Sequence, residues 1–122
     1  MFDKVRALVV GTPDTTTAVS QQLWVTGHIV LVAHSYETAK TLAENAKFDL
    51  VICDLDLHGD ACEIINHLRA TGRNPAAIAL RSEGDETNSA TRSCFNKVVV
   101  KPVHPQQMIG AVNSVLSDPQ HD

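Results

Sequence analysis

The sequence predicts a (βα)5 domain, a doubly wound three-layer α/β sandwich in which helices cover both faces of a five-stranded parallel sheet. Five short apolar runs recur at regular spacing along the 122 residues. The runs lack the apolar/polar alternation of half-exposed strands, and the segments between them are long enough for crossover helices. A chain of this length supports one core, so we expect one domain over residues 1–117 and a flexible tail at 118–122.

The five apolar runs are the expected strands. Each is rich in Val, Ile, Leu or Ala, as suits a strand that is covered on both faces. In chain order they are Val5–Val10, His28–Ala33, Leu50–Cys53, Ala76–Leu80 and Val98–Val100. Parallel strands end at a common edge of the sheet, and we expect the functional site at that edge.

Helix signals follow several of these strands. Ser35 is placed to cap a helix, Ile64, Ile65 and Leu68 give another its apolar face up to Thr71-Gly72, and Pro105 begins the last helix. Trp24 is expected to pack in the core from the first helix. The segment Glu83–Ser93 is almost wholly polar, so a helix there would be weakly anchored.

Composition excludes several classes of function. The net charge is −4, with no run of Lys or Arg, so we expect no direct nucleic-acid partner. No apolar stretch is long enough to span a membrane, and the N-terminus lacks a signal-peptide pattern, which predicts a cytoplasmic protein. Cys53, Cys62 and Cys94 are odd in number without a C-x-x-C spacing. They are therefore interpreted as small buried hydrophobes, with no disulfide or zinc site.

The residues that follow the strands carry the candidate chemistry. They are Gly11-Thr12-Pro13-Asp14, Asp54-Leu55-Asp56, Arg81-Ser82 and Lys101-Pro102. A carboxylate facing an ammonium group from another strand fits either a nucleophile or a cation site, because the lysine offsets the desolvation of the aspartate. A plain ion pair that fixes two loops is the alternative.

The segment from Phe48 to Gly59, with Asp54 after the third strand, and Val98–Pro102, with Lys101 after the fifth, resembles the receiver domain of response regulators. The resemblance covers nearly the whole chain and implies the flavodoxin-like receiver architecture. It implies that Asp54 accepts a phosphoryl group from a histidine kinase or phosphotransfer protein, and that Lys101 contacts the phosphoryl oxygens. It also implies signalling rather than enzymatic activity, and phosphorelay function.

The chain departs from the receiver pattern at several site positions. Gly11 and Thr12 stand where receivers carry an acidic pair that holds Mg²⁺. Arg81 stands at the hydroxyl switch position, with Ser82 as its substitute if the alignment slips by one residue. Val98 replaces the switching aromatic residue, and His58 replaces a proline. These departures predict an atypical, degenerate receiver.

Charge predicts weak metal binding at this site. Asp54 and Asp56 face Lys101 and Arg81, so the cluster is near neutral without Mg²⁺. Asp14 is a possible third carboxylate, although a helix-capping role suits it better. We expect no resident cofactor beyond weakly bound Mg²⁺, and we expect Arg81 or Lys101 to hold Asp54 in one fixed state.

Partner contact is the expected output. In receivers the last strand and last helix, with the fourth helix, bind a downstream protein or a second copy. Here that face comprises Lys97, Val103, His104, Gln106, Gln107 and the Glu83–Ser93 segment. Two other functions share the architecture: a flavodoxin-like cofactor binder that uses the loop at Gly11, and a small hydrolase that pairs Asp54 with His58 or His104.

Overall fold

The structure is a computed structural model and describes residues 5–57, 59–70, 72, 74–84 and 89–116. Its five strands form one parallel sheet in the order β2-β1-β3-β4-β5, as predicted for a doubly wound fold. The strands are β1 (Arg6–Val10), β2 (Ile29–Ala33), β3 (Leu50–Asp54), β4 (Ala76–Arg81) and β5 (Lys97–Val100). The predicted tail at 118–122 lies outside the described residues.

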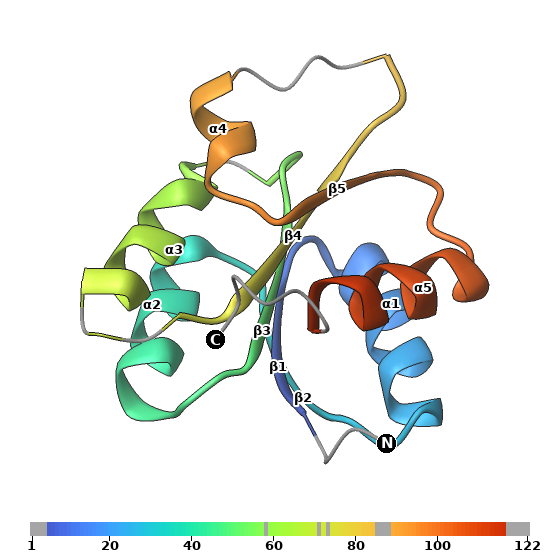
Figure 1. The fold of residues 1–122 in the computed structure, drawn as a ribbon, viewed down its shortest axis with the longest axis horizontal. Helices are drawn as coiled ribbons and strands as arrows, with labels where there is room; N and C mark the ends of the chain where they lie inside the picture. Colours follow the sequence, from blue (N-terminus) through green and yellow to red (C-terminus); the bar gives the residue numbers. More distant parts are fainter. Residues whose placement is uncertain (1–4, 58, 71, 73, 85–88, 117–122) are drawn as a thin grey trace.

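Helices cover the two faces of the sheet (Figure 1). They are α1 (Pro13–Val25), α2 (Tyr36–Asn45), α3 (Ala61–Ala70), α4 (Ser89–Ser93) and α5 (Pro105–Leu116). Figure 1 shows α1 and α5 on one side of the sheet and α2 and α3 on the other. The three-layer sandwich is thereby confirmed. None of the helices among the described residues has the length and apolar character needed to cross a bilayer.

Two hydrophobic clusters, one on each face, form the core. Successive residues of a strand point to opposite faces, so β1 sends Leu8 and Val10 into the cluster under α2 and α3, and Val9 into the cluster under α1 and α5. The three central strands supply fully buried side chains to both clusters. This double burial explains why their sequences are apolar without alternation.

Local signals set the helix ends. The Ser35 hydroxyl accepts the Thr38 N–H at 3.1 Å and caps α2, as predicted. Pro105 is the first residue of α5, also as predicted. The capping role expected of Asp14 is wrong, because the N-cap of α1 is Thr12. Asp14 lies in the first turn, where its negative charge faces the positive end of the helix dipole.

Two predictions of burial are wrong. Ile29 and Leu31 are 44% and 37% exposed because β2 is an edge strand that pairs only with β1. Trp24 is 57% exposed rather than packed in the core. The buried stripe of α1 runs through Thr16, Val19, Ser20 and Leu23, and Trp24 lies at its margin.

The cysteine prediction is correct for one residue and wrong for two. Cys53 is free and buried in β3. Cys62, in the first turn of α3, forms a disulfide with Cys94, which follows α4. Their Cα atoms are 5.8 Å apart although 32 positions separate them in the sequence. Only the packing of the chain brings them together, so their spacing gave no signal.

A matched pair of isoleucines tests this account of the core. Ile52→Ala, at a side chain with 0% exposure, should lower the free energy of unfolding by about 2–5 kcal/mol because it leaves a cavity between sheet and helices. Ile29→Ala, at the exposed edge, should lower it by at most about 1 kcal/mol. Urea denaturation of both variants measures the difference. Equal losses would contradict the placement of the two strands.

Candidate functional site

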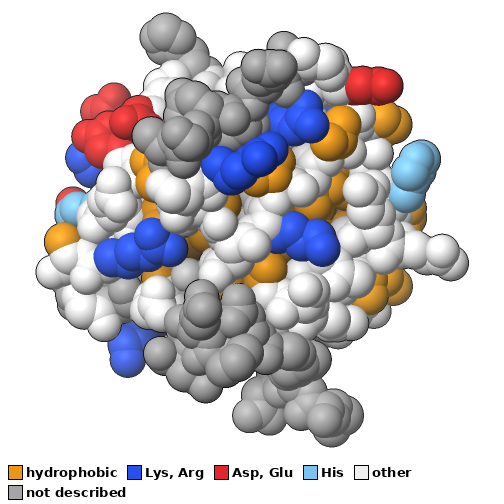
Figure 2. All heavy atoms as spheres, turned by 45° about the horizontal axis from the view of Figure 1, so that its top comes forward, with side chains coloured by type: hydrophobic (Ala, Val, Ile, Leu, Met, Phe, Trp, Pro, Cys, Tyr) orange, Lys and Arg blue, Asp and Glu red, His pale blue; other side chains and the backbone are white. Residues whose placement is uncertain are grey.

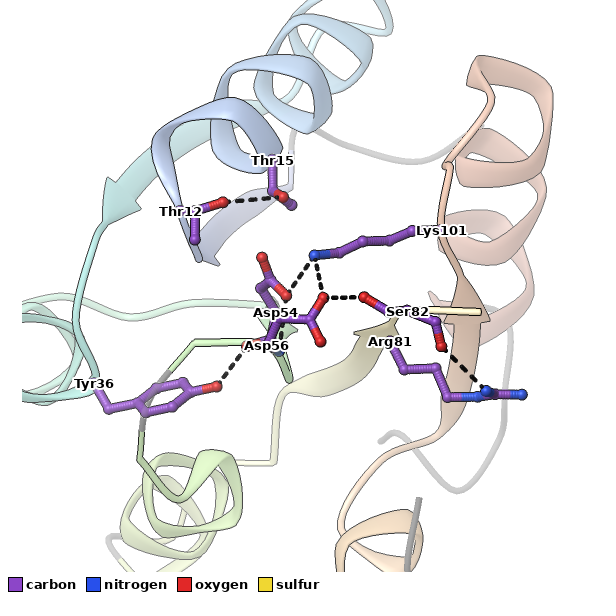
Figure 3. Close-up of polar contacts among 8 residues, drawn as sticks. All are labelled: Thr12, Thr15, Tyr36, Asp54, Asp56, Arg81, Ser82 and Lys101. Carbon is purple, nitrogen blue, oxygen red and sulfur yellow. Dashed lines mark hydrogen bonds and ion pairs between the residues drawn. The ribbon is translucent and has the colours of Figure 1, made fainter. Parts of the chain in front are cut away.

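The carboxyl ends of three neighbouring strands bring four polar side chains together (Figure 3). Asp54 is the last residue of β3, and Asp56 lies two residues beyond it. Ser82 directly follows β4, and Lys101 directly follows β5. The parallel sheet therefore assembles the cluster that the sequence predicted at this edge. Because β4 lies between β3 and β5, the Lys101 side chain reaches across the end of β4 to the carboxylates.

Lys101 bridges the two carboxylates. Its Nζ lies 2.7 Å from Asp54 Oδ1 and 2.9 Å from Asp56 Oδ2. The Asp54 side chain is fully buried, whereas those of Lys101 and Asp56 are 22% and 33% exposed. A buried carboxylate is costly unless it is paired and hydrogen-bonded, and Lys101 supplies the opposite charge. The predicted pairing of Asp54 with Lys101 is confirmed.

Asp56 connects the pair to β4. The Ser82 hydroxyl donates to Asp56 Oδ2, and the Asp56 N–H donates to Asp54 Oδ1 at 3.0 Å. The hydrogen bond from Ser82, followed by the one from Lys101, lowers the pKa of Asp56. Desolvation opposes the charge on Lys101, but hydrogen bonds to Asp54 and Asp56 outweigh it and raise the Lys101 pKa. Both shifts favour the ionised forms of Asp56 and Lys101.

Arg81 does not pair with Asp54. Its guanidinium points away from the carboxylates, and its Nη1 donates to the Ser82 carbonyl at 3.4 Å (Figure 3). Arg81 ends β4, and successive side chains point to opposite sides, so Ser82 faces the cluster. Of the two cations expected to hold Asp54, Lys101 contacts it and Arg81 does not. Ser82, predicted as the substitute for Arg81, is the residue that reaches the site.

Gly11 packs its backbone directly against Asp54. A Cβ at this position would lie 2.9 Å from Asp54 Cβ and 3.2 Å from Asp54 Oδ2, so the site leaves no room for a side chain. Asp54 Oδ2 is buried and has no hydrogen-bond partner among the described residues. Thr12, at the second position of the missing acidic pair, is exposed and donates from Oγ1 to Thr15 Oγ1 at 3.3 Å.

The residues present do not fit a Mg²⁺ site. Within the described ranges, no group of three or more His, Cys, Asp or Glu residues is placed to hold a metal ion. Lys101 pairs with both Asp54 and Asp56, so its single positive charge offsets one of the two carboxylate charges. The near-neutral balance predicted from the sequence is wrong, because Arg81 points away and two carboxylates with one ammonium group give a formal charge of −1. Asp14 is exposed and lines a cleft beside Lys101, without joining the two carboxylates. A hard divalent cation would meet too few oxygen ligands here.

Tyr36 is a site residue that sequence reasoning missed. Its hydroxyl donates to the backbone carbonyl of Asp54 at 2.7 Å, and its ring occupies the space beside Gly59, where a Cβ would lie 2.6 Å from Tyr36 Cδ2. Burial raises the Tyr36 pKa, so the hydroxyl remains a donor. A tyrosine at the start of a helix carries no pattern that links it to a distant strand end.

Comparisons with known proteins show which solved structures are similar to this chain. No protein-family model and no curated protein matches the sequence. A structure from Chloroflexus aurantiacus J-10-fl, solved as that of a candidate response regulator, is 24% identical, with 95% of this chain and 100% of that chain covered and a TM-score of 0.81. A CheY-like receiver domain from Methylobacillus flagellatus is 17% identical, with 93% and 99% covered and a TM-score of 0.82.

The chain has the receiver-domain fold. NtrX from Brucella abortus also matches, at 19% identity and a TM-score of 0.84. The match covers 93% of this chain but only 27% of that one, so there the same fold is part of a longer protein. Within this receiver fold, Asp54 and Lys101 occupy the strand ends that the resemblance in sequence assigned to them.

Two glycines test the contact between Gly11 and Asp54. Gly11→Ala should lower the free energy of unfolding by about 1–3 kcal/mol, because the new methyl group forces Asp54 or β1 to move. Gly110→Ala, where nothing lies within 4 Å, should be neutral or stabilise α5 by up to about 1 kcal/mol. Urea denaturation measures both, and a neutral Gly11→Ala would contradict the close approach.

The shifted pKa values predict how stability depends on pH. Because the Asp56 pKa is lowered, its contribution is present above the ordinary aspartate pKa of about 3.9 and is lost as pH falls through the folded-state value. Because the Lys101 pKa is raised, its contribution is present below about 10.4 and is lost as pH rises through the folded-state value. Unfolding free energies measured across this range should decline at both ends. Asp56→Asn should flatten the acid decline, and an unchanged acid limb would contradict this assignment.

Proposed function

We propose that this chain is an atypical receiver-like signalling domain of a two-component system, which acts by protein contact without Mg²⁺-dependent phosphorylation of Asp54. The observation that supports the proposal is the bridge from Lys101 to both carboxylates, with Gly11 packed where an acidic side chain would stand. The Lys101 ammonium group already pairs with both carboxylates, so less negative charge remains to attract a divalent cation.

Phosphoryl transfer makes demands that this arrangement does not meet. Metal ions normally neutralise the charge that develops on the transferred group, a contribution worth several kcal/mol. Asp54 Oδ1 is engaged by Lys101 and by the Asp56 N–H, and Asp54 Oδ2 is enclosed against Gly11. Both oxygens of the would-be nucleophile are therefore hindered, and Lys101 acts as a permanent counter-ion.

The face beside β5 and α5 is the proposed contact surface. Lys97, His104, Gln106 and Gln107 are exposed there, and Val103 is half-buried. Figure 2, in which the top of Figure 1 is turned forward, shows Lys and Arg side chains scattered among apolar and uncharged ones. Such a mixed surface suits a protein partner. We propose a histidine kinase, a phosphotransfer protein, a downstream protein or a second copy as its partner, a cytoplasmic location and no enzymatic activity.

Asp54 as a working phosphoacceptor is the second candidate function. Its support is the 2.7 Å pairing of Asp54 with Lys101 at the strand ends, which a phosphoacceptor site also requires. Neither a cofactor binder nor a hydrolase gains comparable support. His104 is exposed at the start of α5, and His58 lies outside the described residues. Asp14 places negative charge at the helix start where a cofactor phosphate would bind.

A phosphorylation assay separates the two candidates. The protein is incubated with Mg²⁺ and a small phosphodonor such as acetyl phosphate, and its intact mass is measured beside that of Asp54→Asn. We expect no phosphoryl adduct in either protein, because the metal ligands are missing and Asp54 Oδ2 is enclosed against Gly11. A robust adduct that disappears in Asp54→Asn would overturn the contact-only proposal and establish the phosphoacceptor.

A further inference from the structure

The Cys62–Cys94 disulfide lies outside the Asp54 cluster and plays no part in the proposed function. Cys62 belongs to the first turn of α3, which follows the loop after Asp54 and Asp56. Cys94 follows the last residue of α4. The crosslink thus joins the segments that leave the carboxyl ends of β3 and β4, and Figure 1 shows α4 lying next to the α3 end of the molecule.

The disulfide opens onto a cleft. The cleft has a volume of about 630 Å³ and is lined by Gly59, Asp60, Cys62, Asn66, Thr91, Ser93 and Cys94. This volume lies within the range of small-molecule sites, and Asp60 and Asn66 give its wall polar groups. Cys94 is half-buried and Cys62 is 9% exposed, whereas Cys53 has no exposure at all. A small thiol therefore has a path to this disulfide and none to Cys53.

The α4 segment is tied to α3 at the disulfide and through contacts beside it. α4 has five residues and a polar sequence, and a helix this short is not stable alone. Among the described residues, its end is held by the bond to Cys62 and by Arg69, whose Nη2 donates to the Cys94 carbonyl at 3.1 Å. Beyond Cys94 the chain enters the core, where Phe95 is buried and the Asn96 N–H donates to the Ala77 carbonyl at 2.8 Å.

We propose that Cys62 and Cys94 are a site of reversible thiol–disulfide exchange with low-molecular-weight thiols of the glutathione class, and that the oxidised form fixes α4 against α3. Disulfides are rare in reducing compartments, where an accessible one meets an excess of such thiols. The cleft gives small thiols access to this disulfide, and the five-residue helix beside it is too short to be stable alone. The proposal does not depend on whether Asp54 is phosphorylated.

The exchange balances with two equivalents of thiol. A thiolate attacks Cys94 Sγ, forms a mixed disulfide and releases the Cys62 thiolate. A second thiolate attacks the outer sulfur of the mixed disulfide, which frees Cys94 and forms the small-molecule disulfide. The two protons lost by the attacking thiols end on Cys62 and Cys94. Cys62 Sγ lies 3.7 Å from the Thr91 carbonyl oxygen, so the reduced thiol has an acceptor in place.

Thiol trapping in glutathione buffers tests the exchange. The full chain is equilibrated at graded ratios of reduced to oxidised glutathione, alkylated with N-ethylmaleimide under native conditions, and mapped by mass spectrometry. As the ratio of reduced to oxidised glutathione rises, Cys62 and Cys94 should change together from the disulfide to the alkylated thiols. Cys53 should stay unlabelled, because it is buried and its pKa is raised to about 12 by desolvation and then by Asp54. Cys53→Ser should leave the transition unchanged.

Hydrogen exchange tests the effect on α4. In the reduced protein the α4 amides should exchange on the order of tenfold faster than in the oxidised protein, while those of β3 stay unchanged. Cys94→Ser should show the fast rate at every glutathione ratio. A pair that never links in oxidised glutathione, that stays linked in the most reducing buffer, or whose reduction leaves α4 exchange unchanged would overturn the proposal.

Discussion

A carboxylate without solvent exposure ends the central strand of this sheet, and the surrounding residues are arranged about its charge. Lys101 can reach it only because β3, β4 and β5 are in fixed register, with Asp54 opposite Leu80 and Arg81 opposite Val100. A shift of one residue in either pairing would move the ammonium group and turn alternate side chains to the other face. The apolar core that fixes the register therefore also fixes the ion pair.

The buried charge of Asp54 also accounts for the close contacts around it at the strand ends. Gly11 allows β1 to approach Asp54 so closely that its oxygen Oδ2 is enclosed, while Lys101 donates to Asp54 Oδ1 and Asp56 Oδ2 and Ser82 donates to Asp56 Oδ2. Each of these contacts favours one arrangement of the strand ends. A site of this kind suits a rigid contact module better than a switch, which needs two arrangements of similar free energy.

Sequence patterns predicted the features that depend on many residues at once. The apolar runs predicted the five strands, and the common edge of a parallel sheet predicted that Asp54 lies near Lys101. Such patterns could not predict features that depend on the direction of a single side chain. Arg81 and Ser82 are adjacent and both polar, so only the pleat of β4 decides which faces Asp54. The partner of Cys62 depends on where a short polar helix packs, and Trp24 sits at the margin of a helical stripe.

The exposure of Trp24 matters for how this protein is observed in solution. It is the only tryptophan in the chain, and more than half of its surface meets water at the end of α1. Its indole is already hydrated in the native state, so the emission wavelength should shift little when the sheet unfolds. Fluorescence would report on events near α1 and the β2 edge, while circular dichroism would follow the loss of the core.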